Sequence, residues 1–211
     1  MDLNNDCNST KGSLSGLRIL DLTRVWAGPL ATRILGDFGA EIIKIGDPRR
    51  PINTSSGVNN KLSRNKLNLA LRLDVISGRE IFLDLVKISD VVIENYRPGA
   101  AARLGVDYEA IKAANPLVVM ASISGFGQTG PYASRPALDV IVQGMGGIMS
   151  ITGEPGGGPV RPGSSIGDIT AALFTTVGIL AALREREISG KGQYIDIGMM
   201  DCQVAILENA L

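Results

Sequence analysis

Short apolar runs alternate with helical segments along most of this chain, and this alternation limits the folds that it can adopt more than any other feature. Five runs have the length and apolar content of buried strands: 17–22, 41–45, 67–73, 90–95 and 117–124. Segments that are predicted to be helical lie between several of these runs. They are residues 28–39, a segment that begins after Asp74 as its cap, and residues from Asp107 to Ala114. Strands that alternate with helices form parallel sheets, so we predict an α/β fold: a doubly wound, Rossmann-like parallel sheet flanked by helices.

The last third of the sequence predicts further elements of the same kind. An apolar segment at 137–150 precedes a glycine- and proline-rich stretch at 153–165. A long helix is expected from Asp168 to about Glu187, followed by a strand at 194–199 and a final helix that runs into Leu211. We expect residues 1–13 to be a disordered polar tail, 14–198 to be one domain, and 199–211 to be a helix that leaves it.

The composition argues against several classes of protein. Hydrophobic residues make up 45% of the 211 residues and charged residues 20%, as in globular proteins. Lys plus Arg and Asp plus Glu number 21 each, which argues against a general nucleic-acid surface. The N-terminal residues lack a signal-peptide core, and the longest apolar stretch, 169–183, is too short to cross a bilayer. We expect a cytoplasmic protein that binds neither nucleic acid nor membrane.

The chain contains no histidine, and this restricts the chemistry that it can perform. Ser-His-Asp and Cys-His nucleophile systems and histidine-based metal sites are all excluded, and we predict no metal site. Only two cysteines are present, Cys7 and Cys202, so a disulfide framework is not expected. Any catalysis must depend on carboxylates, lysines, hydroxyls or backbone donors.

Three loops are expected to meet at one edge of the sheet, because ligands of parallel sheets bind beyond the carboxyl ends of the strands. They are RVWAG at 24–28, NYRPG at 95–99 and SGFGQTGP at 124–131. The third spells G-x-G-x-x-G, but Pro131 follows its last glycine and no helical pattern begins there. We therefore interpret its glycines as positions of close backbone approach to a ligand. The long polar segment at 46–65 is a second binding-loop candidate.

Asp168 is the carboxylate with the most chemical interest, and the residues alone leave two interpretations open. Aspartate is a favoured helix N-cap, which accounts for it structurally. Alternatively, the helix dipole keeps it ionised between two glycine-rich loops, where it acts as a covalent nucleophile.

Basic residues near the strand ends also have two interpretations, as solvated surface charges or as a rim that binds phosphate. They are Arg24, Lys44, Arg49, Arg50, Arg64, Lys66, Arg97 and Arg103. Trp26 and Tyr96, in the same loops, could flank an adenine or belong to the core.

Several motifs in one order resemble the class III CoA-transferases, the CaiB/BaiF-type family that includes formyl-CoA transferase-like enzymes and acyl-CoA racemases. They are LRILDLTRVWAGPLATRILGDFGAEIIKI, SRNKLNLALRL, VVIENYRPGAAARLGVDYEAI, NPLVVMASISGFGQTGPYA and GDITAALFTTVGILAALREREISGKGQYIDIGMMD. The resemblance implies an enzyme that moves coenzyme A between carboxylic acids, with Asp168 as the covalent nucleophile. It implies CoA contacts from Val25, Leu71, Asn95, Tyr96, Arg97 and Arg103, and a substrate loop containing Gly125, Gly127 and Gln128. CoA and acyl-CoA are substrates in this family, and no tightly bound cofactor is implied.

The resemblance also concerns subclass and assembly. The racemases carry a histidine in a G-H-D motif where this chain reads Ala137-Leu138-Asp139, so a transferase is favoured over a racemase. Family members are about twice as long, with a second, smaller domain and two interlocked chains. We therefore expect the N-terminal portion of a transferase, truncated before that second domain, that forms a homodimer or joins a complementary subunit. The alternative is an inactive CoA-binding fragment.

Overall fold

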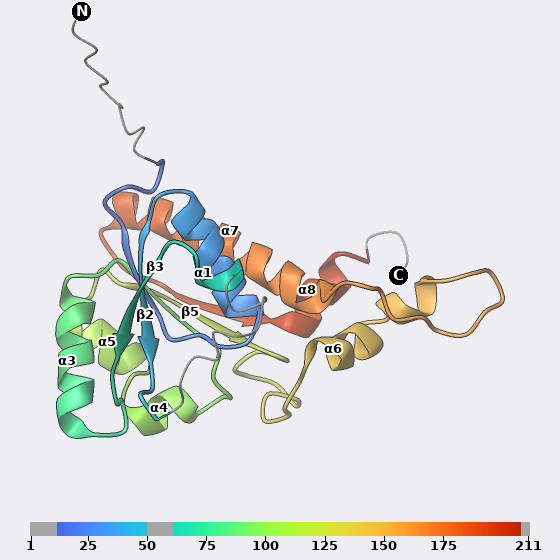
Figure 1. The fold of residues 1–211 in the computed structure, drawn as a ribbon, viewed down its shortest axis with the longest axis horizontal. Helices are drawn as coiled ribbons and strands as arrows, with labels where there is room; N and C mark the ends of the chain where they lie inside the picture. The colour runs from blue at the N-terminus through green and yellow to red at the C-terminus, as the bar shows by residue number, and fades with distance from the viewer. Residues whose placement is uncertain (1–11, 50–60, 208–211) are drawn as a thin grey trace, which may run out of the picture.

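A six-stranded, fully parallel sheet forms the centre of the molecule (Figure 1). The computed structural model describes residues 12–49 and 61–207. Its strands are β1 (Arg18–Asp21), β2 (Glu41–Gly46), β3 (Lys66–Ala70), β4 (Val91–Glu94), β5 (Val119–Ser124) and β6 (Tyr194–Gly198). They lie in the order β3-β2-β1-β4-β5-β6, and β5 pairs with β6 through Met120 and Tyr194. The predicted doubly wound parallel sheet is confirmed.

Helices cover both faces of this sheet, with α1 and α7 on one face and α3 and α5 on the other (Figure 1). Their bounds are α1 (Ala27–Asp37), α3 (Ile76–Lys87), α4 (Ala100–Leu104), α5 (Tyr108–Ala114), α6 (Asp139–Met145), α7 (Ile166–Ser189) and α8 (Met199–Ala205), and η1 (Ile148–Ile151) is a 3₁₀ turn. No helix begins after the third glycine of the 124–131 loop, as predicted, and the next helix is α6.

Two hydrophobic cores result from the alternation of side chains along the strands. Ile19 of β1 faces α1 and α7 and packs in a cluster with Leu35 and Ile179. The next residue, Leu20, faces α3 and α5 and packs with Phe82 and Ile111. Every residue of β4 and β5 is buried, because both faces of a central parallel strand are covered. These two cores fix the strand ends, and so the loops that follow them, in place.

Three sequence predictions about helix starts have different outcomes. Asp107 caps α5 as predicted, since its side chain accepts a hydrogen bond from the Ala110 backbone N–H at 3.3 Å. Asp74 does not cap α3, whose N-cap position is Val75 without a side-chain cap. Helix α7 starts two residues earlier than predicted, with Ser165 at its N-cap, so Asp168 is in the first turn and is not the cap.

The length argument against a membrane span was wrong for α7. This helix has 24 residues and is apolar enough to cross a membrane by length and composition, although half of the relevant stretch is buried inside the fold. The same helix makes extensive contacts with α1 and α8. The place of α7 against the sheet accounts for the buried part of its apolar surface.

Several predictions lie wholly or partly outside the described residues. These are residues 1–11 of the expected tail with Cys7, residues 50–60 of the polar segment with Arg50, and the last residues, 208–211, of the expected final helix.

Candidate functional site

The candidate site lies where the strand order reverses, between the neighbouring strands β1 and β4. The chain leaves β1 toward one side of the sheet and β4 toward the other, which opens a crevice beyond their carboxyl ends. The loops after β1, β4 and β5 meet here, as predicted, and enclose a cavity of about 590 Å³. We call it the Asp168 cavity, and its lining is Val25, Trp26, Ala27, Asn95, Tyr96, Arg97, Pro98, Ile123, Ser124, Gly125, Arg135, Pro136, Ala137, Leu138, Asp139, Ile141, Asp168 and Met199.

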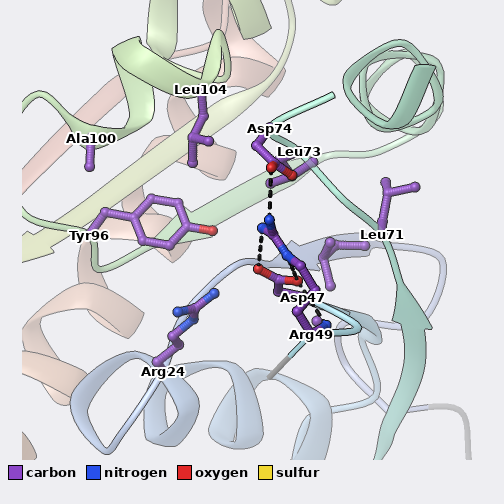
Figure 2. A pocket seen from close by; sticks show the side chains of 11 residues that line it. Arg24, Asp47, Arg49, Leu71, Leu73, Asp74, Tyr96, Ala100 and Leu104 are labelled. Atoms are coloured by element: carbon purple, nitrogen blue, oxygen red, sulfur yellow. Dashed lines mark hydrogen bonds and ion pairs between the residues drawn. The ribbon is translucent and has the colours of Figure 1, made fainter. Parts of the chain in front are cut away.

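A second cavity, of about 300 Å³, lies beside the first and shares Tyr96 with it. We call it the Leu71 cavity (Figure 2), and its lining is Arg24, Ile45, Gly46, Asp47, Arg49, Leu71, Leu73, Asp74, Tyr96, Ala100 and Leu104. Burial, the main cause, raises the pKa of the Tyr96 phenol to about 12, so this hydroxyl stays neutral and can donate a hydrogen bond. Two cavities that share one wall suit a ligand with two chemically different ends.

The loop after β1 is held by reciprocal hydrogen bonds to Asn95 in the loop after β4. The Arg24 backbone N–H donates to Asn95 Oδ1 at 2.8 Å, and Asn95 Nδ2 donates to the Arg24 carbonyl at 2.7 Å. The next residue, Val25, has a left-handed φ of 68°, which is unfavourable for a β-branched residue. Its side chain is 79% exposed, so packing within the described residues does not compensate for this backbone strain.

Buried ion pairs at the end of β1 hold the other side of the same loop. Asp21 is fully buried and accepts hydrogen bonds from the Thr23 backbone N–H at 2.8 Å and the Thr23 hydroxyl at 2.6 Å. Its carboxylate pairs with Lys44 at 2.9 Å and with Lys66 at 3.0 Å. Burial raises the pKa of Asp21, but the two lysines and Thr23 together outweigh it and leave this pKa far below its usual value.

These pairs correct the hypothesis of a phosphate-binding rim for several of its members. Lys44 and Lys66 are committed to Asp21, and Lys66 also donates to the Pro29 carbonyl at 2.9 Å. Arg64 pairs with Asp37, and Arg49 pairs with Asp47 and Asp74 (Figure 2). Among the described residues, Arg24, Arg97 and Arg103 have no acidic partner within ion-pair distance. Of the proposed rim residues that the structure describes, these three remain as unpaired cations.

Asp168 has an environment that opposes its ionisation, in contrast to the expectation from the helix dipole. Burial, followed by repulsion from the Asp139 carboxylate, raises the pKa of Asp168 to about 6, and a hydrogen bond with the Ala27 backbone offsets only part of this. The dipole is therefore too weak to keep this pKa low. At pH 7 the carboxylate is still mostly ionised, but it is poorly solvated, which favours nucleophilic attack.

Asp139 organises the start of α7, a function that the sequence did not indicate. Its Oδ1 accepts hydrogen bonds from the backbone amides of Gly167 at 2.9 Å and Asp168 at 3.3 Å. Its Oδ2 accepts from Gln143 Nε2 at 2.6 Å and from Arg161 at 3.4 Å. Because Ser165 forms no side-chain cap, Asp139 supplies from another helix the acceptor that the amides at the start of α7 require.

The residues implied by the resemblance fall into three groups. Val25, Asn95, Tyr96, Arg97 and Gly125 line the Asp168 cavity together with Asp168, whereas Leu71 lines the neighbouring cavity. Arg103, Gly127 and Gln128 are in the lining of neither. Gln128 instead donates its backbone N–H to Asp196 of β6 at 2.8 Å, and Gly127 adopts a left-handed φ of 80° beside the same carboxylate.

The side chains that line the two cavities indicate which kinds of ligand they could hold. Within residues 12–49 and 61–207, no group of three or more His, Cys, Asp or Glu side chains could hold a metal ion. The Leu71 cavity offers aliphatic and aromatic walls, which can contact a base, beside Arg24, which can contact a phosphate. Arg135, which lines the cavity with Asp168, and Arg161, which contacts Asp139, were missed because neither directly follows a predicted strand and neither belongs to a periodic segment.

Comparisons with known proteins agree with this geometry. The family model of CoA-transferase family III matches residues 14–211. The succinyl-CoA:glutarate CoA-transferase of Mus musculus is 43% identical over 96% of this chain and 48% of its own length. The acetyl-CoA:oxalate CoA-transferase of Acetobacter aceti is 44% identical over 95% of this chain and 54% of its own length. The chain thus spans about half the length of these curated relatives.

A solved structure has the same architecture. The crystal structure of a CaiB/BaiF family protein from Brucella suis superposes with a TM-score of 0.89 and 38% identity, over 95% of this chain and 56% of that one. The sequence match and the structural match both run along nearly the whole of the chain and cover only part of the relatives. The chain therefore belongs to CoA-transferase family III.

Proposed function

We propose that this chain carries the CoA-binding and nucleophile-bearing part of a CoA-transferase, which moves coenzyme A from an acyl-CoA donor to a carboxylic acid acceptor. One observation carries the proposal: a half-buried carboxylate, Asp168, lines a cavity at the switch point of the sheet, and its pKa is raised to about 6. A structural helix cap would not require such a position, and Asp168 is not the cap of α7.

The proposed reaction passes through covalent intermediates on the Asp168 side chain. A carboxylate oxygen attacks the thioester carbonyl of the donor, the C–S bond breaks, and CoA leaves as a thiolate from a mixed anhydride. The thiolate then attacks the aspartyl carbonyl, which releases the donor acid as a carboxylate and leaves an aspartyl-CoA thioester. The acceptor carboxylate then attacks the aspartyl-CoA thioester, which forms a second mixed anhydride and releases the CoA thiolate. The thiolate attacks the acceptor carbonyl of this anhydride, which gives the new acyl-CoA and restores the Asp168 carboxylate. No proton needs to be transferred, which is consistent with the absence of histidine.

We place the CoA moiety across the wall that Tyr96 forms between the two cavities. Leu71 and the Tyr96 ring would contact the adenine end, and Arg24 and Arg97, which line the cavities, would contact phosphates. Arg103 is in the lining of neither cavity, and we retain it as a candidate phosphate contact. The thioester would then reach Asp168 past Val25 and Asn95, in the loops that meet at the switch point. Gly125 lines the cavity and packs closely against Ala137, which would keep the loop at the acyl end of the site compact, and we retain Gly127 and Gln128 as candidates there.

We also infer that the chain associates with a second copy or with a complementary subunit. Leu173, Phe174 and Val177 of α7 are 49%, 40% and 63% exposed, and apolar side chains exposed together on one helix mark a candidate interaction site. Light scattering of the purified chain tests this inference. We expect a mass above that of one chain, and a lower mass for Val177→Glu.

Trapping of the covalent intermediate tests the function. The chain is incubated with succinyl-CoA and hydroxylamine, and its peptides are analysed by mass spectrometry; succinyl-CoA is chosen because relatives are named for succinyl-CoA and glutarate. We expect an aspartyl hydroxamate at Asp168, formed from the thioester or anhydride. Asp168→Ala should abolish the label, whereas Asp84→Asn, an exposed carboxylate paired with Lys87 on α3, should retain it. A label on another residue, or none, contradicts the proposal.

A further inference from the structure

We propose that Arg135 binds a second carboxylate, remote from the reacting one, and so selects dicarboxylic acids as the acyl groups and acceptors of this site. The inference rests on the proposed function, since it assigns a substrate class to the same cavity. It concerns a residue that neither the sequence motifs nor the resemblance had singled out.

Arg135 lies in the Asp168 cavity as an uncommitted cation. It lines the cavity together with Leu138, Asp139 and Asp168. Within the described part of the chain no acidic side chain lies within ion-pair distance of its guanidinium. The nearby Arg161 differs, because it already contacts Asp139 at 3.4 Å. Arg135 therefore has its charge available for a ligand.

An aromatic contact holds the Arg135 guanidinium in place. Its central carbon lies over the Tyr132 ring, 4.1 Å from the ring centroid. Tyr132 in turn meets Phe126 edge to face, with centroids 5.6 Å apart. A guanidinium stacked on a ring keeps the N–H donors in its own plane free, and these donors match the two oxygens of a carboxylate. The arginine is thus ordered without being neutralised.

The position of Arg135 in the fold favours the acyl group over the phosphates of CoA. The Leu71 cavity, which we assign to the nucleotide end, is lined only by residues between Arg24 and Leu104. Arg135 belongs to the segment after β5 and lines the other cavity, whose lining also includes Asp168 and Asp139. If Arg24 binds a phosphate at the nucleotide end of the ligand, Arg135 is available to contact its acyl end.

The carboxylates of the cavity also favour a cation beside a second substrate carboxylate. Asp139, which contacts Arg161, and Asp168 both line the cavity, so the Asp168 carboxylate would repel a substrate that brings a second carboxylate with the reacting one. Arg135 offsets this repulsion for a dicarboxylate. A simple fatty acyl group has no second charge and gains nothing from the arginine.

Binding of three matched ligands tests the role of Arg135. Asp168→Asn removes the nucleophile, so that acyl-CoA esters are not consumed, and calorimetry then measures the Kd of succinyl-CoA, butyryl-CoA and free CoA. We expect Arg135→Gln in this background to raise the Kd of succinyl-CoA by roughly 10- to 100-fold, as for the loss of a charged hydrogen-bonded contact. The Kd values of butyryl-CoA and free CoA should change by less than about twofold. Arg135→Lys should recover part of the loss. Arg184→Gln, at the far end of α7 and paired with Glu187, is the matched control and should change none.

Two results would overturn the assignment. Equal weakening of all three ligands would make Arg135 a phosphate contact or a structural residue, and no weakening of any would remove it from the site. Hydroxylamine labelling of Asp168 with butyryl-CoA in the single variant Arg135→Gln separates this failure from that of the proposed function. A label there, together with either result, shows that transfer chemistry stands without Arg135. If neither ester labels Asp168 in the parent chain, the proposed function itself fails.

Discussion

The carboxylate of Asp139 accepts a hydrogen bond from the backbone amide of Asp168 at 3.3 Å, and the same carboxylate repels the Asp168 side chain electrostatically. One residue thus has two effects on the nucleophile that we propose. It positions the first turn of α7, and it adds to the effect of burial in raising the pKa of Asp168. The two effects can be separated, because an amide retains an oxygen acceptor but carries no charge.

We predict that Asp139→Asn lowers the pKa of Asp168 from about 6 toward its ordinary value, because the repulsion is removed. It stays above the ordinary value, since burial is the larger cause and is unchanged. The rate of hydroxylamine labelling at Asp168, measured between pH 4 and 8, should follow the fraction of Asp168 that is ionised. The pH at which this rate is half-maximal should be lower in the variant than in the parent. An unchanged midpoint, with Asp84→Asn as the control for lost charge, would show that Asp139 has no electrostatic effect.

The pKa of Asp168 also predicts how stability depends on pH. Because the pKa is raised from 3.8 to about 6 on folding, the folded chain binds this proton more tightly than the unfolded chain. The resulting stabilisation is fully present below about pH 4 and is lost as the pH rises through 6. Asp168→Asn is neutral throughout, so its free energy of unfolding should exceed that of the parent at pH 7.5 and approach it at pH 4. Urea unfolding of the variant and the parent at both pH values measures the difference between their free energies of unfolding. The same difference at pH 7.5 and at pH 4 would contradict the prediction.

Lys66→Met is expected to destabilise the fold by about 3–5 kcal/mol, because it leaves the buried Asp21 carboxylate with only one of its two lysines. The Lys66 side chain is 2% exposed and also donates to the Thr32 hydroxyl at 2.7 Å. Lys87→Met, which breaks an exposed pair with Asp84, is the matched control and should cost less than about 0.5 kcal/mol. Chemical denaturation of the two variants should show this contrast. Similar losses for both would mean that the buried network contributes no more than a surface pair.

Gly125→Ala should disrupt the loop after β5 in a way that a second substitution repairs. A Cβ at position 125 would lie 2.2 Å from Cβ of Ala137, and the next nearest atom, Cα of Ala137, would be 3.4 Å away. We expect a loss of roughly 1–3 kcal/mol in stability, with weaker CoA binding, from this overpacking. Ala137→Gly removes the clashing atom, so the double variant should recover most of the loss. If the double variant is no better than Gly125→Ala alone, the clash is not the cause.

The sheet could be predicted from the sequence because the central strands β4 and β5 are mostly apolar, as burial on both faces requires. Helix α4 could not be predicted, since it has five residues between Gly99 and Gly105, both with a left-handed φ, and is too short to show a period. The meeting of three loops at one edge followed from the parallel topology alone.

Other properties of the site depend on contacts between residues far apart in the sequence, which local sequence patterns do not predict. The pKa of Asp168 could not be predicted, because it depends on burial and on Asp139, which precedes it by 29 residues. Lys44 was a candidate for a phosphate rim, or else for a solvated surface charge, because its strand ends near the loops. It instead lies opposite Asp21 in the pairing of β1 with β2, where its charge is satisfied. Whether a cation is free to bind a ligand depends on the register of the strands, and this register cannot be predicted from the composition of a loop.

The position of β6 at the edge of the sheet has a consequence for biosynthesis. Its Tyr194 pairs with Met120 of β5, so a nascent polypeptide must emerge from the ribosome well beyond the core strands before this edge can close. Until then β5, all of whose residues are buried in the finished molecule, presents an open edge to other newly made chains. We expect slow translation between these two strands to increase misassembly, and chaperones that shield extended hydrophobic segments to act during this interval.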